Sequence, residues 1–478
     1  MNDAVGRPWA VVLSSDVVGL GAVRSLHAGG VPTLVVMLDP LEPARASRYG
    51  QKILVPKSRD VEGALLDALA EVNREPRPVL IPTSDHLVHF VAKHRAHLEV
   101  HYRCCIPPDA AINVALDKAK DTQLLQGTTI PLPRTVQMLP ASPAELVRQL
   151  GLPIIVKPRT HADKEGVGWR NVIIRSVADA DAFYRTSGAV LGRVIAQELI
   201  PGPDEALWEC ICLFNADSEI ARAFTFRKLA TMPAHYGATS RGRSERNEAL
   251  VDLAARVGKQ FNYTGIADID VKYDARDGRY KYLELNPRLG VCHHFGTRCG
   301  KNVILDAYRL ACGEDLPEDV PQVEGRTFLA VLEEIGGRLQ DGDSLVAVLR
   351  GLLVALLHRP VGAYFAPDDV WPGPFAVFRI SCRLLARAWR GQLGAVFTKQ
   401  FTRALEDGGQ RIRTSTGLPP AVFKTAALPV RSSPPDRRKL ESLGDHGQSA
   451  AAIRRSGHRG GRQFGRPAQC PTGSANAT

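Results

Sequence analysis

The stretch KYLELNPR at residues 281–288 places a carboxylate and an amide two residues apart on a strand-like run. Side chains alternate along a strand, so Glu284 and Asn286 are expected on one face. Two oxygen donors on one face suit a hard cation such as Mg²⁺, which takes few protein ligands and completes its shell with water and phosphate. Arg288 follows closely enough to steady an anionic group beside that ion.

A second strand-like run, GIADIDVKY at residues 265–273, precedes this stretch, and the turn-forming sequence DARDG at 274–278 joins the two. The pair is typical of a β-hairpin. Asp268 and Asp270 share one face of the first strand. If that face is the one that carries Glu284, Asp270 becomes a third metal ligand; otherwise the hairpin has a solvated acidic face.

The composition fits a globular protein of roughly two to four domains, with 478 residues of which 44% are hydrophobic and 23% charged. The net charge of +11 is concentrated in residues 401–478, which hold 13 Lys and Arg against five Asp and Glu. We therefore expect no nucleic-acid partner. The same segment is rich in Gly, Pro, Ser, Arg and Gln, so we interpret it as a disordered basic tail.

The nine cysteines include no CxxC pair, which argues against a disulfide framework or a zinc site. The N-terminus has no long apolar run behind a basic end, so a cytoplasmic protein is expected. The most apolar stretch, 345–357, is too short to span a membrane and contains Arg350. Residues 378–397 are amphipathic and basic; we expect them to pack on the protein, with contact to a membrane surface as the alternative.

Strand-like and helical runs alternate over the first 110 residues, which predicts a parallel α/β domain. Gly19 and Gly21 open its first helix, but Arg24 stands where a dinucleotide-binding fingerprint requires a third glycine. A nicotinamide-dependent enzyme is therefore a weaker interpretation that rests on these two glycines alone.

One lysine further along, Lys157, is a candidate for phosphate binding. Lys118 begins a predicted helix directly after Asp117, and Lys157 ends the buried strand IIVKP at 154–158. We predict a polar, glycine-bearing loop at 160–171 after this strand. Flexible backbone N–H groups in such a loop can close over anionic oxygens.

Together these motifs resemble the ATP-grasp superfamily, and within it the carboxylate–amine ligases of the carbamoyl-phosphate-synthase-like or D-aspartate-ligase-like type. The resemblance extends from about Pro82 to Glu314. It rests on the order and spacing of Asp117-Lys118, IVKP, QELIPG at 197–202, FRK at 226–228 and DVKYDARDGRYKYLELNPR at 270–288. It implies a pre-ATP-grasp α/β domain followed by a two-lobed α+β ATP-grasp domain. The expected boundaries are 1–110 for the pre-ATP-grasp domain, 111–190 and 191–315 for the two lobes, 316–400 for a C-terminal extension and 401–478 for the tail.

The resemblance also implies roles for individual residues. Those for the nucleotide are phosphate contacts from Lys118 and Lys157, adenine contacts from Gln197, Glu198, Leu199 and Ile200, and ribose contacts from Glu205. Asp270, Glu284 and Asn286 would hold one or two Mg²⁺ ions, with Mn²⁺ as an alternative. Lys228 would reach the γ-phosphate, and Arg288 would stabilise the acyl phosphate. The chain departs from its relatives at Asp270, where they often carry Glu, and in having only Gly166 and Gly168 in the glycine loop.

The implied function is an ATP-dependent ligase that activates a carboxylate as an acyl phosphate and joins it to an amine. A carboxylate is a poor electrophile until phosphorylation provides a leaving group, and that transfer needs charge neutralisation above all. The alternative is a non-catalytic ATP-binding regulatory protein with the same fold. A biotin-dependent carboxylase is disfavoured because the sequence has no AMKM-like biotinylation site. His293 and His294 could contact the acceptor or serve a structural role, and the sequence identifies neither the substrates nor the oligomeric state.

Overall fold

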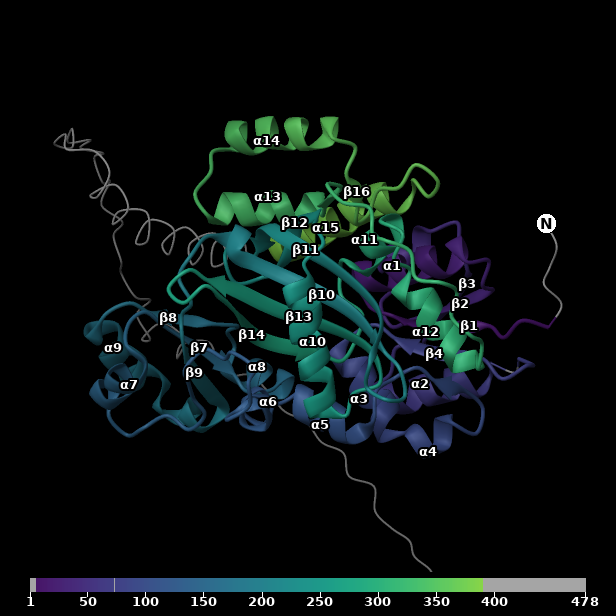
Figure 1. Cartoon of the computed structure of the whole chain (residues 1–478). Helices are drawn as coiled ribbons and strands as arrows, with labels where there is room; N and C mark the ends of the chain where they lie inside the picture. Colours follow the sequence, from purple (N-terminus) through teal and green to yellow (C-terminus); the bar gives the residue numbers. More distant parts are fainter. Residues whose placement is uncertain (1–5, 73, 390–478) are drawn as a thin grey trace, which may run out of the picture. The chain divides into compact units, whose positions relative to one another are not determined.

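The computed structural model describes residues 6–72 and 74–389, which contain three β-sheets (Figure 1). The N-terminal sheet is fully parallel, with strand order β3-β2-β1-β4-β5. Its central strands are buried along their whole length, as expected for parallel strands covered on both faces. The strands are β1 (Ala10–Ser14), β2 (Thr33–Met37), β3 (Gln51–Leu54), β4 (Val79–Pro82) and β5 (Arg103–Cys104). The helices are α1 (Asp16–Ala28), α2 (Val61–Ala70), α3 (Asp85–Lys93) and α4 (Arg95–Leu98), with a 3-10 turn η1 (Pro43–Ala46).

A small antiparallel sheet follows, with strand order β6-β9-β7-β8. Its apolar face packs on two helices around a core that includes Leu146, Ile154 and Phe183. The strands are β6 (Thr135–Val136), β7 (Ile154–Pro158), β8 (Val172–Ile174) and β9 (Val194–Glu198), and the two helices are α7 (Pro143–Leu150) and α9 (Val177–Ser187). Three further helices and one 3-10 turn belong to this region: α5 (Asp109–Ala115), α6 (Lys118–Leu125), α8 (His161–Val167) and η2 (Gly188–Arg193).

The third sheet has seven strands in the order β14-β13-β10-β11-β12-β15-β16, and it is antiparallel except for the last pair. Its strands are β10 (Leu207–Phe214), β11 (Ile220–Met232), β12 (Ala238–Ser244), β13 (Gly265–Asp274), β14 (Arg279–Asn286), β15 (Thr327–Leu329) and β16 (Val361–Gly362). Helix α10 (Glu248–Phe261) packs its apolar stripe on β10, β13 and β14. The 3-10 turn η3 (Asp204–Ala206) leads into β10.

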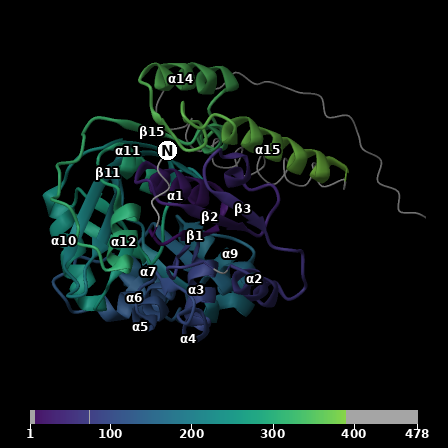
Figure 2. The same ribbon diagram turned by 90° about the vertical axis from the view of Figure 1, so that its right-hand side faces the viewer.

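One hydrophobic core joins the N-terminal sheet to the seven-stranded sheet. Helices α11 (His293–Arg298) and α12 (Val303–Cys312) follow β14 and pack against α1, as Figure 2 also shows. Phe295 at the centre of this core contacts Phe224 and Phe226 of β11 edge to face. The N-terminal domain is therefore held against the seven-stranded sheet by α1, α11 and α12.

Residues 316–389 belong to the same core. They supply β15 and β16, and the helices α13 (Val331–Gln340), α14 (Leu345–Leu357) and α15 (Pro372–Trp389). The Arg24 side chain donates to the Asp369 carboxylate at 2.9 Å and to the carbonyls of Ala363 and Tyr364, with Arg24 and Asp369 both buried. The C-terminal extension thereby closes over α1.

The predicted fold class is confirmed: a parallel N-terminal α/β domain precedes mixed α and antiparallel β structure. The exact domain boundaries stay a prediction. Within residues 6–72 and 74–389, no helix is long and apolar enough to cross a membrane. The predicted tail at 401–478 lies outside the described residues, as does the end of the amphipathic stretch 378–397.

Candidate active site

A cavity of about 830 Å³ lies among the three sheets and is lined by residues from all of them. The N-terminal domain contributes the ends of β1 and β4, and the small sheet contributes β7 and β9. Strands of the seven-stranded sheet form the long wall of the cavity. Every predicted site residue except Glu205 lines this cavity.

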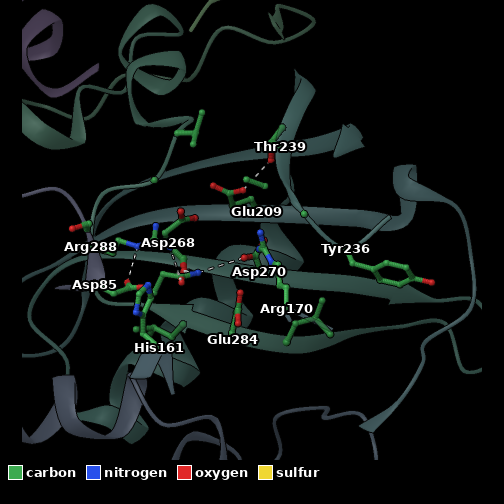
Figure 3. A pocket seen from close by; sticks show the side chains of 18 of the residues that line it. Asp85, His161, Arg170, Glu209, Tyr236, Thr239, Asp268, Asp270, Glu284 and Arg288 are labelled. Carbon is green, nitrogen blue, oxygen red and sulfur yellow. Dashed lines mark hydrogen bonds and ion pairs between the residues drawn. The ribbon is translucent and has the colours of Figure 1, made fainter. Parts of the chain in front are cut away.

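Three carboxylates form a row across neighbouring strands of this wall (Figure 3). Glu209 on β10 lies directly opposite Asp270 on β13, and Asp270 lies directly opposite Glu284 on β14. Directly opposed residues share a face of the sheet. The same face carries Asp268 opposite Asn286, two residues along each strand. The predicted hairpin therefore carries Asp268 and Asp270 on the same face as Glu284 and Asn286.

Lysines neutralise most of this row. Lys228 on β11 lies 3.0 Å from Glu209 and forms a second ion pair with Asp270. Burial lowers the pKa of Lys228, but Asp270 and Glu209 outweigh burial and raise it well above its usual range. Burial raises the pKa of Asp270 to about 6 even with Lys228 beside it. Lys228 thus forms an ionic bridge between β10 and β13.

The small-sheet side of the cavity supplies two more lysines. Lys118, at the start of α6, lies 2.6 Å from Glu284. The charge of Lys118 is the main reason that the pKa of the Glu284 carboxyl is lowered. Lys157, at the end of β7, donates to Gln197 at 3.0 Å. Burial lowers the pKa of Lys157 to about 8. A half-buried lysine with no carboxylate in hydrogen-bond contact is suited to an incoming phosphate.

Arg288 is held in place from two directions. It donates to Asp85 at 2.7 Å and to the side-chain oxygen of Asn286 at 3.1 Å, and Asp85 opens α3 of the N-terminal domain. The amide nitrogen of Asn286 in turn lies 3.4 Å from Asp270. Arg288, Asn286 and Asp270 therefore form a continuous polar chain, and Figure 3 shows Arg288 and Asp270 along the wall of the cavity.

The oxygen donors fit a hard cation. Asp270 and Glu284 lie side by side, and Asn286 lies one alternation further along β14. Carboxylate and amide oxygens are the ligands that Mg²⁺ prefers, with phosphate oxygens completing its shell. Within the described part of the chain, no three His, Cys, Asp or Glu side chains cluster as a metal site on their own. The binding role of these three residues stays a prediction.

The predicted adenine segment lies at one end of the cavity, on β9 and the residues after it. The Glu198 carboxylate accepts from Arg134 at 3.1 Å and from Arg276 at 3.2 Å. The backbone N–H of Leu199 donates to Pro153. These contacts fix the segment at the mouth of the cavity, and its role toward adenine is untested.

The structure differs from two predictions, one for Glu205 and one for residues 160–171. Glu205 is exposed on η3 and lines a second cavity, so the structure does not bring it to the other predicted residues. The predicted loop at 160–171 contains the helix α8, with Thr160 as its N-cap at 3.1 Å from the Asp163 N–H. The loop prediction was wrong because the two glycines outweighed this capping signal, and Gly168 instead ends the helix with positive φ.

The two histidines have different surroundings. His293 is buried beside the wall, its Nδ1 accepts from the Gly290 N–H, and burial lowers its pKa to about 4. His294 lies against α1, 3.2 Å from the Ser25 hydroxyl. His294 is therefore part of the packing between α11 and α1.

Sequence reasoning missed Glu209 and gave Asp268 no role. Glu209 is the one charged residue in the otherwise apolar strand LWECICLF, which is a signal that could have identified it. Asp268 was placed on the correct face. Its approach to Glu209 depends on pairing between β10 and β13, which are about 60 residues apart in the sequence.

Residues 209–319 match the family model described as carbamoyl-phosphate synthase L chain, ATP binding domain. The chain is 23% identical over 315 residues to a D-aspartate ligase from Enterococcus faecium, a match that covers 61% of this chain and 74% of that protein. It is also 35% identical over 94 residues to an acetyl-CoA carboxylase from Arabidopsis thaliana, of which the match covers 4%.

Two solved structures resemble the fold. A biotin carboxylase from Campylobacter jejuni superposes with a TM-score of 0.53 at 16% identity, covering 68% of this chain and 75% of that one. A carboxyaminoimidazole ribonucleotide synthase from Aspergillus clavatus, complexed with ATP, superposes with a TM-score of 0.54 at 17% identity, covering 73% and 86%. With the motif order, the parallel N-terminal domain and the carboxylate-bearing hairpin, these likenesses show that the chain has the fold of the ATP-grasp proteins and that residues 209–319 are similar to the ATP-binding domain of carbamoyl-phosphate synthase.

Proposed function

We propose that the protein is an ADP-forming ligase that phosphorylates a carboxylate with ATP and joins the resulting acyl group to an amine. One observation carries this proposal: Lys118, Lys157 and Lys228 converge with the row of carboxylates and Arg288 in a single cavity. A protein that only stored or sensed ATP would need the lysines and the predicted metal ligands, but it would not need Arg288 in addition.

In the first step an oxygen of the substrate carboxylate attacks the γ-phosphorus of ATP. The new oxygen–phosphorus bond forms as the bond to the β–γ bridging oxygen breaks, and ADP leaves. Charge spreads over the γ-phosphate oxygens, so the cations of Lys118, Lys157 and Lys228 supply the stabilisation. Mg²⁺ held by Asp270 and Glu284 would neutralise phosphate charge and align the oxygens.

In the second step the amine nitrogen attacks the acyl carbon, and the carbon–oxygen bond to phosphate breaks. Starting from an ammonium group, one proton leaves with inorganic phosphate and one is released to solvent. Arg288 is placed to stabilise the oxyanion of the tetrahedral intermediate, because Asp85 and Asn286 fix its guanidinium beside the metal residues.

The nucleotide would lie with its adenine against Gln197–Ile200 and its phosphates toward Lys157. Glu205 belongs to this proposal as the ribose contact, although it is exposed on η3 and lines a second cavity, so η3 would have to approach the nucleotide for this contact to form. The likeness to a D-aspartate ligase supports an amino acid as one of the two substrates.

The test is ADP release across a panel of amino acids, other carboxylates and amines, with Mg²⁺ or Mn²⁺ present and then removed with EDTA. The proposal expects release that requires a divalent ion and a specific carboxylate, and that rises when an amine is added. Glu284→Gln is the matched negative control. Binding of ATP without release on any member of the panel would instead support a non-catalytic ATP-binding protein.

A further inference from the structure

The side chains along β13 divide the cavity into successive sites. Every second residue faces the cavity, beginning with Lys272, which donates to the Gly202 carbonyl at 2.9 Å beside the adenine segment. Asp270 comes next, at the metal residues, and Asp268 follows toward the N-terminal domain. Side chains two positions apart on a strand are about 7 Å apart. Asp268 therefore lies beyond the point where the γ-phosphate reacts, on the side opposite the adenine.

Asp268 differs from the other carboxylates of the wall in its partners. Glu209 and Asp270 share Lys228, and Glu284 pairs with Lys118. Asp268 is 4% exposed, and among the residues that the structure describes it forms no ion pair. Its Oδ1 accepts no hydrogen bond although the side chain lines the cavity. A cation in the adjacent space would stabilise the ionised form of this buried carboxyl group.

The protein side of Asp268 is closed. A Cβ at Gly290 would collide with its Oδ2, so the chain after Arg288 passes directly over the carboxylate and no side chain can enter there. Its acidic neighbour Glu209 is 5% exposed and is fixed by Lys228 and by Thr239 at 3.3 Å. The remaining open direction is the cavity itself.

The far end of the cavity is acidic as well. It is lined by Asp16 and Glu42 of the N-terminal domain and by Glu333 of α13, whose Oε2 is buried without a hydrogen-bond partner; Asp16 pairs with Arg379 at 2.9 Å. The basic side chains that surround the phosphate position, from Lys118 to Arg170, come from the opposite, small-sheet side. The basic side chains of the cavity are thus gathered on the small-sheet side, and Glu42 and Glu333 add carboxyl groups on the side of the N-terminal domain and α13.

We propose that Asp268, supported by Glu209, binds the cationic nitrogen of the amine substrate next to the acyl phosphate. This inference rests on the proposed ligase function and assigns the acceptor to the class of amino acids and other protonated amines. The nitrogen would then lie between Asp268 and Arg288, adjacent to the carbon that it attacks. Asp268 is a binding residue in this account and takes part in no covalent step.

The test compares wild type with Asp268→Asn and with Asp277→Asn, a control at the exposed turn of the same hairpin. The amine used is the one that stimulates ADP release by the wild-type protein. Its KM should be at least tenfold higher in Asp268→Asn than in wild type, while the KM for ATP changes less than twofold. Hydroxylamine, which is uncharged at pH 8, should trap the acyl phosphate equally well in both. Asp277→Asn should match wild type in every measurement.

A second measurement does not need turnover. Thermal shifts with ATP and Mg²⁺ are recorded for a panel of amino acids and for their des-amino counterparts. The inference expects shifts from amino acids alone, lost in Asp268→Asn; if that variant does not fold, Asp268→Ser makes the same comparison. An unchanged amine KM, or equal shifts in wild type and variant, would overturn the inference. Absence of carboxylate-dependent ADP release in wild type would overturn the proposed function instead.

Discussion

Replacing Lys228 by methionine should destabilise the protein and abolish turnover. The Lys228 side chain is 6% exposed and bridges Glu209 and Asp270, which have side-chain exposures of 6% and 18%. Methionine keeps the length of the stem and removes the charge, which leaves two buried carboxylates without a cation. Breaking a buried ion pair in this way costs about 3–5 kcal/mol. We expect the lower part of this range, because Asp270 can bind a proton in response.

The pH dependence follows from the same residues. Burial raises the pKa of Asp270 to about 6 in the folded protein, above its usual range, and loss of Lys228 would raise it further. A carboxyl with a raised folded pKa makes the folded state bind more protons than the unfolded state, so stability falls as pH rises through that folded pKa. The penalty of Lys228→Met should therefore be larger at pH 7.5 than at pH 5.5.

Scanning fluorimetry and urea denaturation at both pH values provide the assay. A loss of about 3 kcal/mol corresponds to a fall in melting temperature of roughly 6–12 °C for a large domain. Adding Glu209→Gln to Lys228→Met should recover part of this loss, because one of the two unpaired charges is removed. A melting temperature within about 1 °C of wild type at pH 7.5 would refute the ionic bridge.

Three further predictions concern separate parts of the molecule. Glu284→Gln and Asn286→Ala should each abolish ADP formation with circular dichroism unchanged, and normal turnover in either variant would remove that residue from the metal site. Lys157→Ala should weaken ATP binding by about tenfold or more, as expected for a lost charged hydrogen bond, and calorimetric titration would expose the error if affinity stayed the same. Arg24→Met should leave the buried Asp369 unpaired and lower the free energy of unfolding by about 3 kcal/mol; Arg24→Met with Asp369→Asn should restore part of it.

The motifs predicted much of the fold because each lies on a local element that its own residues favour. The run IIVKP forms the buried strand β7 through its continuous apolar residues, the residues LELN alternate along the half-buried end of β14, and Asp117 caps α6 through its own side chain. Helix α8 was missed although Thr160 and Asp163 carry a capping pattern, since the two glycines and the polar residues around them favoured a loop. Glu205 shows the opposite case, in which a matched motif position lies on a 3-10 turn whose side chain faces outward.

The hairpin shows why local patterns alone left the metal site open. Its register begins with Asp274 opposite Arg279, and regular pairing from there would set Asp270 opposite Leu283. Glu284 would then face the other side of the sheet, since a shift of one residue reverses the face. The structure places a β-bulge between Asp270 and Val271 in this register, which takes up Leu283 as the extra residue and brings Glu284 opposite Asp270. The face of β14 on which the predicted metal ligand Glu284 lies is therefore set by the bulge, which the turn sequence alone does not predict.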